Sequence, residues 1–303
     1  MKAAHSNASG QVHTPVLLHE SVMSLDIAAG DVIVDGTFGG GGHSTVIAEQ
    51  LKETGLLICV DLDEAAEVRF AEKFQTAKHV KFVHSNFKDV AVILSEAGVT
   101  IVNKVLLDLG TSVFQLLADT RGFSFHSDTP LTMTFSEHGS HTGFNAYDIV
   151  NSWAEESIAD IIYGYGEDRS SRRIARAIVA ARAITPIVTA IQLANVIEAA
   201  VPRRGRIHPA TKTFQALRIA VNDELGTLTT AMNAWWDALS PHGRLSIITF
   251  HSLEDRLVKQ WMKAKAEESL GSILTKKPIA PSDEELQVNP RSRSAKLRTI
   301  EKN

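Results

Sequence analysis

The fold of this chain is decided by the stretch Val32-Ile33-Val34-Asp35-Gly36-Thr37-Phe38-Gly39-Gly40-Gly41-Gly42-His43-Ser44. Three β-branched residues run into an acid and then into four consecutive glycines, and an apolar helical pattern continues to Leu51. This order predicts a strand, a glycine loop and a helix. Glycine lets the backbone approach a ligand closely, and the first turn of the helix directs its free N–H groups at whatever lies on the loop.

A second apolar strand, residues 56–60, ends in Asp61, which lies 19 residues after Gly42. An acid at that distance is placed to accept hydrogen bonds from ribose hydroxyls. The dinucleotide fingerprint G-x-G-x-x-G fails because Ser44 or Thr45 stands at its third glycine, and no Lys-Ser or Lys-Thr follows as in phosphate-binding loops. The pattern favours a nucleoside cofactor without a pyrophosphate, of which S-adenosylmethionine is the obvious one, over a glycine turn that binds nothing.

Strands and helices alternate up to about residue 110, which predicts a parallel sheet with right-handed crossovers. Ligands of such sheets lie beyond the carboxyl ends of the strands. Four residues each close a predicted strand, and we expect them to line one crevice: Asp35, Asp61, Phe87 and Asp108.

A helical block then replaces the alternation. After a loop-like stretch, helices are predicted over residues 154–163, 171–183 and 191–200, the last with a capping box of Thr189 and Gln192, and a long helix begins near Thr211. A turn at 241–244 and a strand at 245–250 return the chain to the sheet. We therefore expect a sheet domain formed by residues 1–118 and 213–303, interrupted by a helical insertion of residues 119–212.

The formal net charge of −4 conceals a strong asymmetry. Residues 169–218 hold ten Lys and Arg against the single acid Glu198, which gives this segment +9 and leaves −13 for the rest. Because balancing acids are missing, a surface that binds nucleic acid is favoured over a merely solvated helix face. The candidate RNA contacts are Arg172, Arg176, Lys212 and Arg218, with Arg291 and Arg293 from a second basic patch in the tail.

Composition points to a protein of a reducing compartment, and we expect it to be cytoplasmic. The only cysteine, Cys59, lies inside an apolar strand, the polar first twelve residues do not read as a signal peptide, and no run reaches the length of a membrane span.

Two stretches that contain histidine have structural explanations. His138-x-x-His141 has the spacing of metal ligands on a helix, but it lies in a loop of Gly, Ser and Thr without cysteine, so we predict no metal site. His251-Ser252-Leu253-Glu254-Asp255 follows the returning strand. It predicts a helix that Ser252 caps and for which Asp255 completes a capping box.

Several blocks in order resemble the MraW family of ribosomal RNA methyltransferases over about residues 13–300. They are His13-Thr14-Pro15-Val16-Leu17, the glycine stretch 35–44, Leu107-Asp108-Leu109-Gly110, Arg121-Gly122-Phe123-Ser124-Phe125, Tyr165-Gly166-Glu167, His208-Pro209-Ala210-Thr211, residues 213–219, residues 250–256 and residues 290–295.

The resemblance implies an α/β fold, a Rossmann-like class I methyltransferase sheet with an inserted helical domain that recognises the substrate. It implies an enzyme that uses S-adenosylmethionine to methylate N4 of a cytidine in the decoding region of 16S rRNA, within a small ribosomal subunit or its precursor. No membrane is involved, and monomer and homodimer stay open as alternatives. The implied cofactor contacts are Gly41, Gly42, His43, Asp61, Phe87, Asp108 and Gln115.

The chain departs from the family pattern in two places. Residues 129–136 read Thr-Pro-Leu-Thr-Met-Thr-Phe-Ser where the family usually has G-P-L-D-M-R-M-D, and Gly40 stands where an arginine is usual. The altered run motivates an alternative, an RNA-binding ribosome-assembly protein with a vestigial cofactor site. A nucleotide-dependent oxidoreductase is a weaker alternative because the fingerprint is broken. Asp108 is the candidate for a polar contact at the reacting centre, and no residue is assigned as general base.

Overall fold

The computed structural model describes residues 15–110, 120–136, 139–140, 142–203, 205 and 208–303. The chain divides into two compact units, which we describe separately: unit 1 is residues 1–112 with 227–303, and unit 2 is residues 113–226. The second boundary lies later than the predicted 212/213. Helix α10 (Thr211–Asn222) belongs to unit 2 because Phe214, Leu217 and Val221 are buried in that unit's core.

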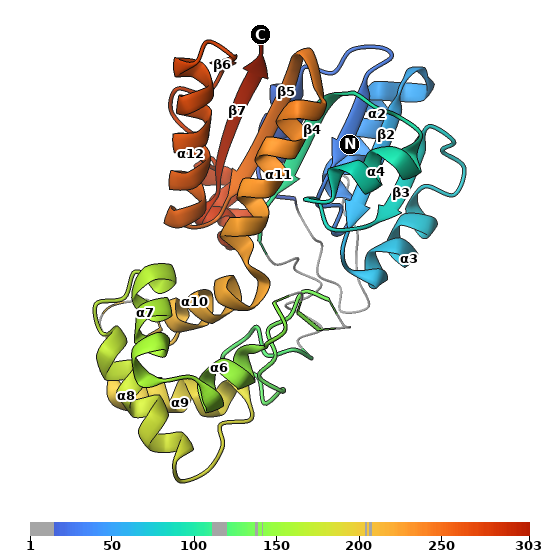
Figure 1. Cartoon of the computed structure of the whole chain (residues 1–303). Helices are drawn as coiled ribbons and strands as arrows, with labels where there is room; N and C mark the ends of the chain where they lie inside the picture. Colours follow the sequence, from blue (N-terminus) through green and yellow to red (C-terminus); the bar gives the residue numbers. More distant parts are fainter. Residues whose placement is uncertain (1–14, 111–119, 137–138, 141, 204, 206–207) are drawn as a thin grey trace. The chain divides into compact units, whose positions relative to one another are not determined.

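Unit 1 is built on a seven-stranded sheet in the order β3-β2-β1-β4-β5-β7-β6 (Figure 1). The first five strands in this order are parallel, whereas β7 is antiparallel to both β5 and β6. The order reverses between β1 and β4, and such a switch point opens a crevice at the carboxyl ends of the two strands. The strands are β1 (Val32–Asp35), β2 (Leu56–Asp61), β3 (Val80–His84), β4 (Val102–Asp108), β5 (Leu239–Thr249), β6 (Gly271–Ile273) and β7 (Lys296–Lys302).

Helices cover both faces of this sheet, which is why its central strands read as continuous apolar runs. One face packs against α4 (Val90–Ala97), α11 (Glu224–Ala238) and α12 (Ser252–Glu267), around the fully buried Trp235. The opposite face packs against α1 (Leu18–Leu25), α2 (Gly42–Leu51) and α3 (Glu64–Lys73). The short elements of unit 1 are η1 (Lys52–Thr54), α13 (Asp283–Val288) and η2 (Pro290–Ser294). The predicted α/β sheet with a helical insertion is thereby confirmed.

Unit 2 is helical in its described part, as the sequence predicts. Ile174 and Ile178 of α8 pack in one buried cluster with Ile158 and Ile162 of α7. The helices are α6 (Ala146–Ser152), which was not predicted, α7 (Glu155–Gly166), α8 (Ser171–Arg182), α9 (Ala190–Ala200) and α10. Helix α9 begins with the predicted capping box, in which Thr189 and Gln192 exchange hydrogen bonds.

Two local predictions were wrong. The expected long helix from Thr211 is broken into α10 and α11, because Asp223 adopts a left-handed conformation (φ 45°) that ends the first helix. The expected turn at 241–244 lies inside β5, where it forms a bulge: Leu239 pairs with Val102, but Arg244 already pairs with Lys104. On β5, residues 240–243 thus stand opposite the single residue Asn103 of β4, and His242 takes a positive φ of 61°.

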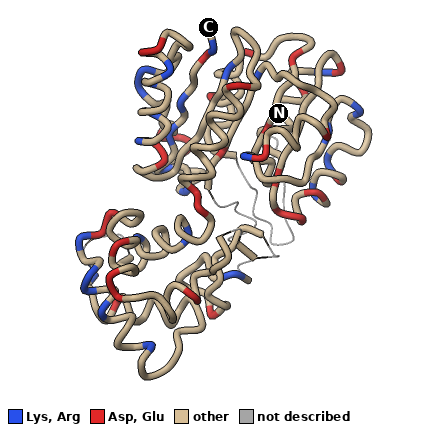
Figure 2. Tube along the Cα trace, viewed as in Figure 1, with Lys and Arg blue, Asp and Glu red and all other residues tan. Residues whose placement is uncertain are grey.

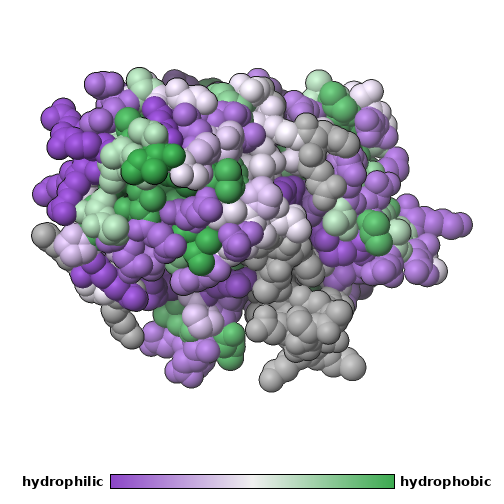
Figure 3. Space-filling model, turned by 90° about the horizontal axis from the view of Figure 1, so that it is seen from below, coloured by the Kyte–Doolittle hydropathy of each residue, from purple (hydrophilic) through white to green (hydrophobic). Residues whose placement is uncertain are grey.

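Large apolar side chains that reach solvent lie on separate elements, among them Met23 on α1, Tyr163 on α7 and Val288 on α13. On the face drawn in Figure 3, hydrophobic residues occur between hydrophilic ones. Among the described helices, none combines the length and the apolar character that crossing a membrane requires.

Candidate functional site

The glycine loop is fastened to the sheet by the buried carboxylate of Asp35. One oxygen of Asp35 accepts a hydrogen bond from Ser44 Oγ (2.6 Å) and the other accepts one from the Thr37 N–H (3.2 Å). Burial raises the pKa of Asp35, although these hydrogen bonds act in the opposite direction. With both oxygens engaged and only 1% of the residue exposed, Asp35 joins β1 to the first turn of α2 and does not face the crevice, contrary to our expectation.

Two of the four glycines stand where a side chain does not fit. Gly41 caps α2 with φ +69°, and a Cβ there would lie 2.6 Å from the ring of Phe38. A Cβ at Gly42 would lie 2.1 Å from Pro15 Cγ. Because these two glycines lack side chains, the backbone of the loop packs directly against Phe38 and Pro15 at the point where α2 begins.

Asp61 connects the end of β2 to this loop. Its Oδ2 accepts a hydrogen bond from the Gly39 N–H (2.7 Å), and its Oδ1 accepts one from the Asp63 N–H (2.9 Å). Burial is the main cause that raises the pKa of Asp61. Each carboxylate oxygen keeps a second acceptor position, so the residue can still accept hydrogen bonds from ribose hydroxyls.

Asp108 closes β4 on the other side of the switch point. Its backbone N–H donates to Thr37 Oγ1 (2.7 Å), which connects it to the glycine loop. Burial raises the pKa of Asp108 well above its ordinary value, and the nearby carboxylates of Asp35, Glu254 and Glu285 raise it further. Its Oδ1 is buried and has no hydrogen-bond partner among the described residues. A buried oxygen without a partner fits a ligand that supplies a donor.

His43, in the first turn of α2, lies beside Asp108, with 3.7 Å between His43 Nδ1 and Asp108 Oδ2. Its Nε2 lies 3.0 Å from the carbonyl oxygen of Val16, so Nε2 carries the proton and Nδ1 is left as an acceptor. Burial lowers the pKa of His43 to about 4. The imidazole is therefore neutral at pH 7, with its unprotonated Nδ1 beside the Asp108 carboxyl group.

Phe87 follows β3 and packs partly buried against the core. A Cβ placed on Gly36 would lie 3.3 Å from Phe87 Cβ, and the Phe87 carbonyl accepts a hydrogen bond from Trp235 Nε1 (2.8 Å). These contacts place Phe87 beside the start of the glycine loop. Gln115 lies outside the described residues. The structure thus gathers Gly41, Gly42, His43, Asp61, Phe87 and Asp108 at the carboxyl edge of the sheet.

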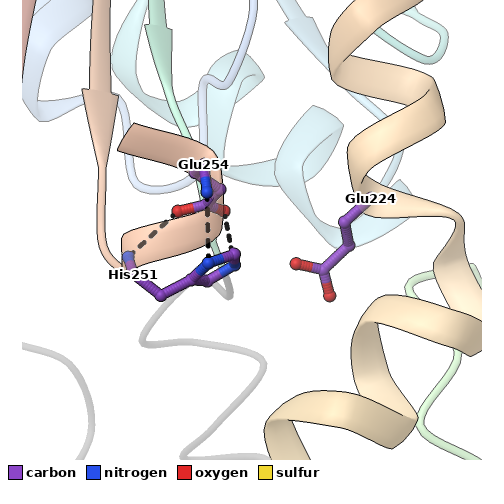
Figure 4. Close-up of side chains that lie close together, drawn as sticks. All are labelled: Glu224, His251 and Glu254. Carbon is purple, nitrogen blue, oxygen red and sulfur yellow. Dashed lines mark hydrogen bonds and ion pairs between the residues drawn. The ribbon is translucent and has the colours of Figure 1, made fainter. Parts of the chain in front are cut away.

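The cap of α12 differs from the prediction (Figure 4). His251, not Ser252, is the N-cap, and its Nδ1 accepts a hydrogen bond from the Glu254 N–H (3.3 Å). Glu254 Oε2 accepts in return from the N–H groups of Phe250 (2.8 Å) and His251 (3.2 Å). Asp255 is engaged elsewhere, by Lys296 (2.9 Å) and Arg298 (2.7 Å) of β7. The pair His138 and His141 lies outside the described residues.

The predicted RNA contacts differ in their surroundings. Arg172 and Arg176 are exposed on α8, where Lys and Arg positions gather (Figure 2). Arg176 Nε lies 3.7 Å from Glu155 Oε1, and such a solvent-exposed ion pair contributes little to stability. Lys212 is exposed and donates to the Glu167 carbonyl (2.8 Å). The remaining exposed candidates are Arg291 and Arg293, both on η2.

Arg218 is the exception. It forms a two-pronged ion pair with Glu224, with distances of 2.6 and 2.9 Å, and its side chain is only 19% exposed. Glu224 follows the +9 segment in the sequence, so a charge count that stops at residue 218 missed it. Because its charge is already balanced, we remove Arg218 from the expected phosphate contacts.

The altered run at residues 129–136 borders an open cavity of about 520 Å³ within unit 2. Thr132 and Thr134 line it together with Arg121 and Asp148. Arg121 Nη1 donates to the Phe135 carbonyl (2.8 Å), and its guanidinium carbon lies 5.7 Å from the centre of the Phe123 ring. Hydroxyl side chains therefore line this cavity at two positions where the family usually has an acid and an arginine.

Comparison with known proteins identifies the family. The model of the MraW methylase family matches residues 10–303. A protein named ribosomal RNA small subunit methyltransferase H from Clostridioides difficile is 45% identical over 309 residues, covering 96% of this chain and 98% of the relative. Relatives of the same name come from Deinococcus deserti (45% identity; 98% and 95% covered) and Deinococcus radiodurans (46%; 96% and 89%). The resemblance seen in the sequence is confirmed, and the chain belongs to the MraW methylase family.

Proposed function

We propose that this protein transfers a methyl group from S-adenosylmethionine to N4 of a cytidine in 16S rRNA of the small ribosomal subunit or its precursor, in the cytoplasm. The observation that carries the proposal is the joining of the glycine loop to two strand-end acids. Gly39 donates to Asp61, and Thr37 accepts from the Asp108 N–H, so one loop holds both acids at the switch point of the sheet.

The residues present fit this cofactor. Asp61 is held at the end of β2, where it can accept hydrogen bonds from ribose hydroxyls, and the glycines at 41 and 42 keep side chains away from the start of α2. The buried Oδ1 of Asp108, which has no partner among the described residues, offers an acceptor to a donor on the ligand. When bound, S-adenosylmethionine supplies a methyl group activated by a positively charged sulfur.

The chemical contribution of the protein is positioning and the handling of one proton. Holding the methyl donor and the cytosine amino group in line supplies much of the rate enhancement of such a transfer. The amino group must also lose a proton, and its lone pair is delocalised into the ring. We assign Asp108 the contact to an amino hydrogen. Its raised pKa makes the ionised form a better proton acceptor than an ordinary carboxylate, and the proton then stays on Asp108, beside neutral His43 at 3.7 Å.

The exposed cations of unit 2 suit the approach of an RNA chain. Arg172, Arg176 and Lys212 present positive charge to solvent, and Arg291 and Arg293 do so on unit 1. The altered run lies in unit 2, whereas the glycine loop, Asp61 and Asp108 lie in unit 1. The change therefore does not touch these three parts of the cofactor site, which favours an enzyme over a protein with a vestigial site.

Calorimetry tests the cofactor half of the proposal. S-adenosylhomocysteine, the product of methyl transfer, should bind to the purified protein, and NAD should not. Asp61→Ala should weaken binding of the product by about 1–3 kcal/mol, because ribose hydroxyls lose their acceptor. Asp237→Ala, at an exposed position on α11, is the control and should leave the affinity unchanged. Equal affinity of the Asp61 variant and the unmutated protein would remove Asp61 from the site.

A further inference from the structure

Lys73, the last residue of α3, is a partly buried lysine whose charged end is shielded from solvent. Its Nζ is buried and has no hydrogen-bond partner among the described residues. Its aliphatic stem lies against the glycine loop, since a Cβ placed on Gly41 would be 3.2 Å from Lys73 Cδ. Phe70 of α3 and Phe74, its C-cap, pack with Phe38 of the loop in an aromatic cluster.

This arrangement is unfavourable for the protein alone. A buried ammonium group without a partner loses its hydration and gains nothing in return, and burial lowers the pKa of Lys73 for that reason. A methionine would fill the same space beside the aromatic rings without this cost. No described residue balances this charge, so a bound anion beside the glycine loop would balance it.

The glycine loop offers a second attraction for an anion at the same place. Helix α2 starts at Gly42, and its N-cap Gly41 has no side chain to accept from the first turn. Asp35 accepts from Ser44 in this turn, which leaves the N–H groups of Gly42 and His43 for a ligand. These N–H groups and the helix dipole favour a negative charge at this end. The ammonium of Lys73 and the start of α2 thus border the same loop position and favour the same charge.

We propose that Lys73 binds the carboxylate of the methionine portion of the cofactor, in concert with the first turn of α2. The inference rests on the proposed function, because that carboxylate is the only anionic group of S-adenosylmethionine. It adds a cation to the site that neither the glycine pattern nor the strand-end acids indicate. In this role Lys73 is a binding residue, and the reacting methyl group lies at a different part of the cofactor.

The test compares two ligands that differ in this carboxylate. S-adenosylhomocysteine contains the amino acid portion, whereas 5′-methylthioadenosine lacks it. Calorimetry with the full chain should show that Lys73→Met weakens binding of S-adenosylhomocysteine about 10-fold or more, the loss expected for a charged hydrogen bond. Its affinity for 5′-methylthioadenosine should match that of the unmutated protein. Lys78→Met, which changes an exposed lysine close by, should alter neither affinity.

The melting temperature of the ligand-free protein gives a second readout. Lys73→Met should raise it by about 2–4 °C, because an unpaired buried charge is removed. Lys73→Gln keeps a polar side chain without the charge and repeats the ligand comparison if the methionine variant fails to fold. Unchanged affinity for S-adenosylhomocysteine in the variants, or an equal loss for both ligands, would overturn the proposal. If the unmutated protein binds neither ligand, the proposed function itself fails.

Discussion

The imidazole of His43 shows how strongly single residues at this site depend on burial. Burial lowers its pKa to about 4, and the carbonyl of Val16 opposes this only in part. The folded protein therefore binds fewer protons than the unfolded chain between pH 6.5 and about 4. Stability that is fully present above pH 6.5 is lost as the pH falls through this window, by about 3 kcal/mol in total for this group.

An NMR titration of the His43 ring measures this pKa directly. We expect a midpoint near 4, with the proton on Nε2 throughout the neutral range. Comparing the pH dependence of unfolding with that of His43→Gln should assign the same window to this residue. A midpoint near the ordinary 6.5 would show that the imidazole is solvated and would remove its role beside Asp108.

The residue types of the site could be predicted from the sequence, but their contacts could not. The acids at 35, 61 and 108 were identified because each closes a strand. The spacing does not show, however, that both carboxylate oxygens of Asp35 accept hydrogen bonds from Ser44 and Thr37. The interaction of Asp108 with His43 depends on how α2 starts, and the approach of Lys73 to Gly41 depends on how α3 crosses the loop. Such contacts arise from tertiary packing, which local patterns do not encode.

At the scale of elements, the start of α2 depends on the absence of side chains. Gly42→Ala should lower the free energy of unfolding by about 1–3 kcal/mol and weaken cofactor binding, because the new Cβ would overlap Pro15. Chemical denaturation and calorimetry measure the two effects.

Gly164→Ala, in the exposed part of α7, is the matched control. Nothing lies within 4 Å of a Cβ there, so it should raise stability by about 0.5–1 kcal/mol through helix propensity. If Gly42→Ala is as stable and binds as well as the unmutated protein, the loop does not need its tight packing.

Strands and helices that carry one strong local sequence pattern were predicted well. Elements that are defined by contacts with residues distant in the sequence were not. The apolar strands β1, β2 and β4 are buried on both faces, and α9 shows its capping box in the sequence. Strand β7 was read only as a basic tail, because Lys296, Arg298 and Lys302 are interspersed with its two apolar residues, Leu297 and Ile300. In the structure Lys296 and Arg298 pair with Asp255 of α12, which a linear reading does not bring near them.

For the whole molecule, the asymmetric charge predicts how RNA is bound. Reversing Arg172 and Arg176 to Glu should weaken RNA binding and reduce the slope of log affinity against log salt by about 0.7–0.9 for each lost phosphate contact. Cofactor affinity should not change, because the described cofactor residues Gly41, Gly42, His43, Asp61, Phe87 and Asp108 lie in unit 1 and neither arginine is among the implied contacts. Filter binding over a salt series, beside calorimetry, measures both.

The control is Lys259 and Lys263, both reversed to Glu. They share the same spacing on the exposed side of α12 and change the net charge equally. If both double variants lose RNA affinity alike, the effect is one of total charge. If the arginine variant behaves as the unmutated protein does, RNA binds elsewhere, and Arg291 and Arg293 are the next residues to change.

The central claim is methyl transfer to a cytidine amino group at the site around Asp108, and mass-spectrometric mapping of methylated nucleosides tests it most directly. Purified protein is incubated with S-adenosylmethionine and with either free 16S rRNA or small subunits that lack the modification. We predict one N4-methylated cytidine per 16S rRNA. Its formation should be at least about 100-fold slower in Asp108→Asn and unchanged in Asp237→Asn. No methylated cytidine in either substrate, a methyl group on another atom, or full activity of Asp108→Asn would contradict the account.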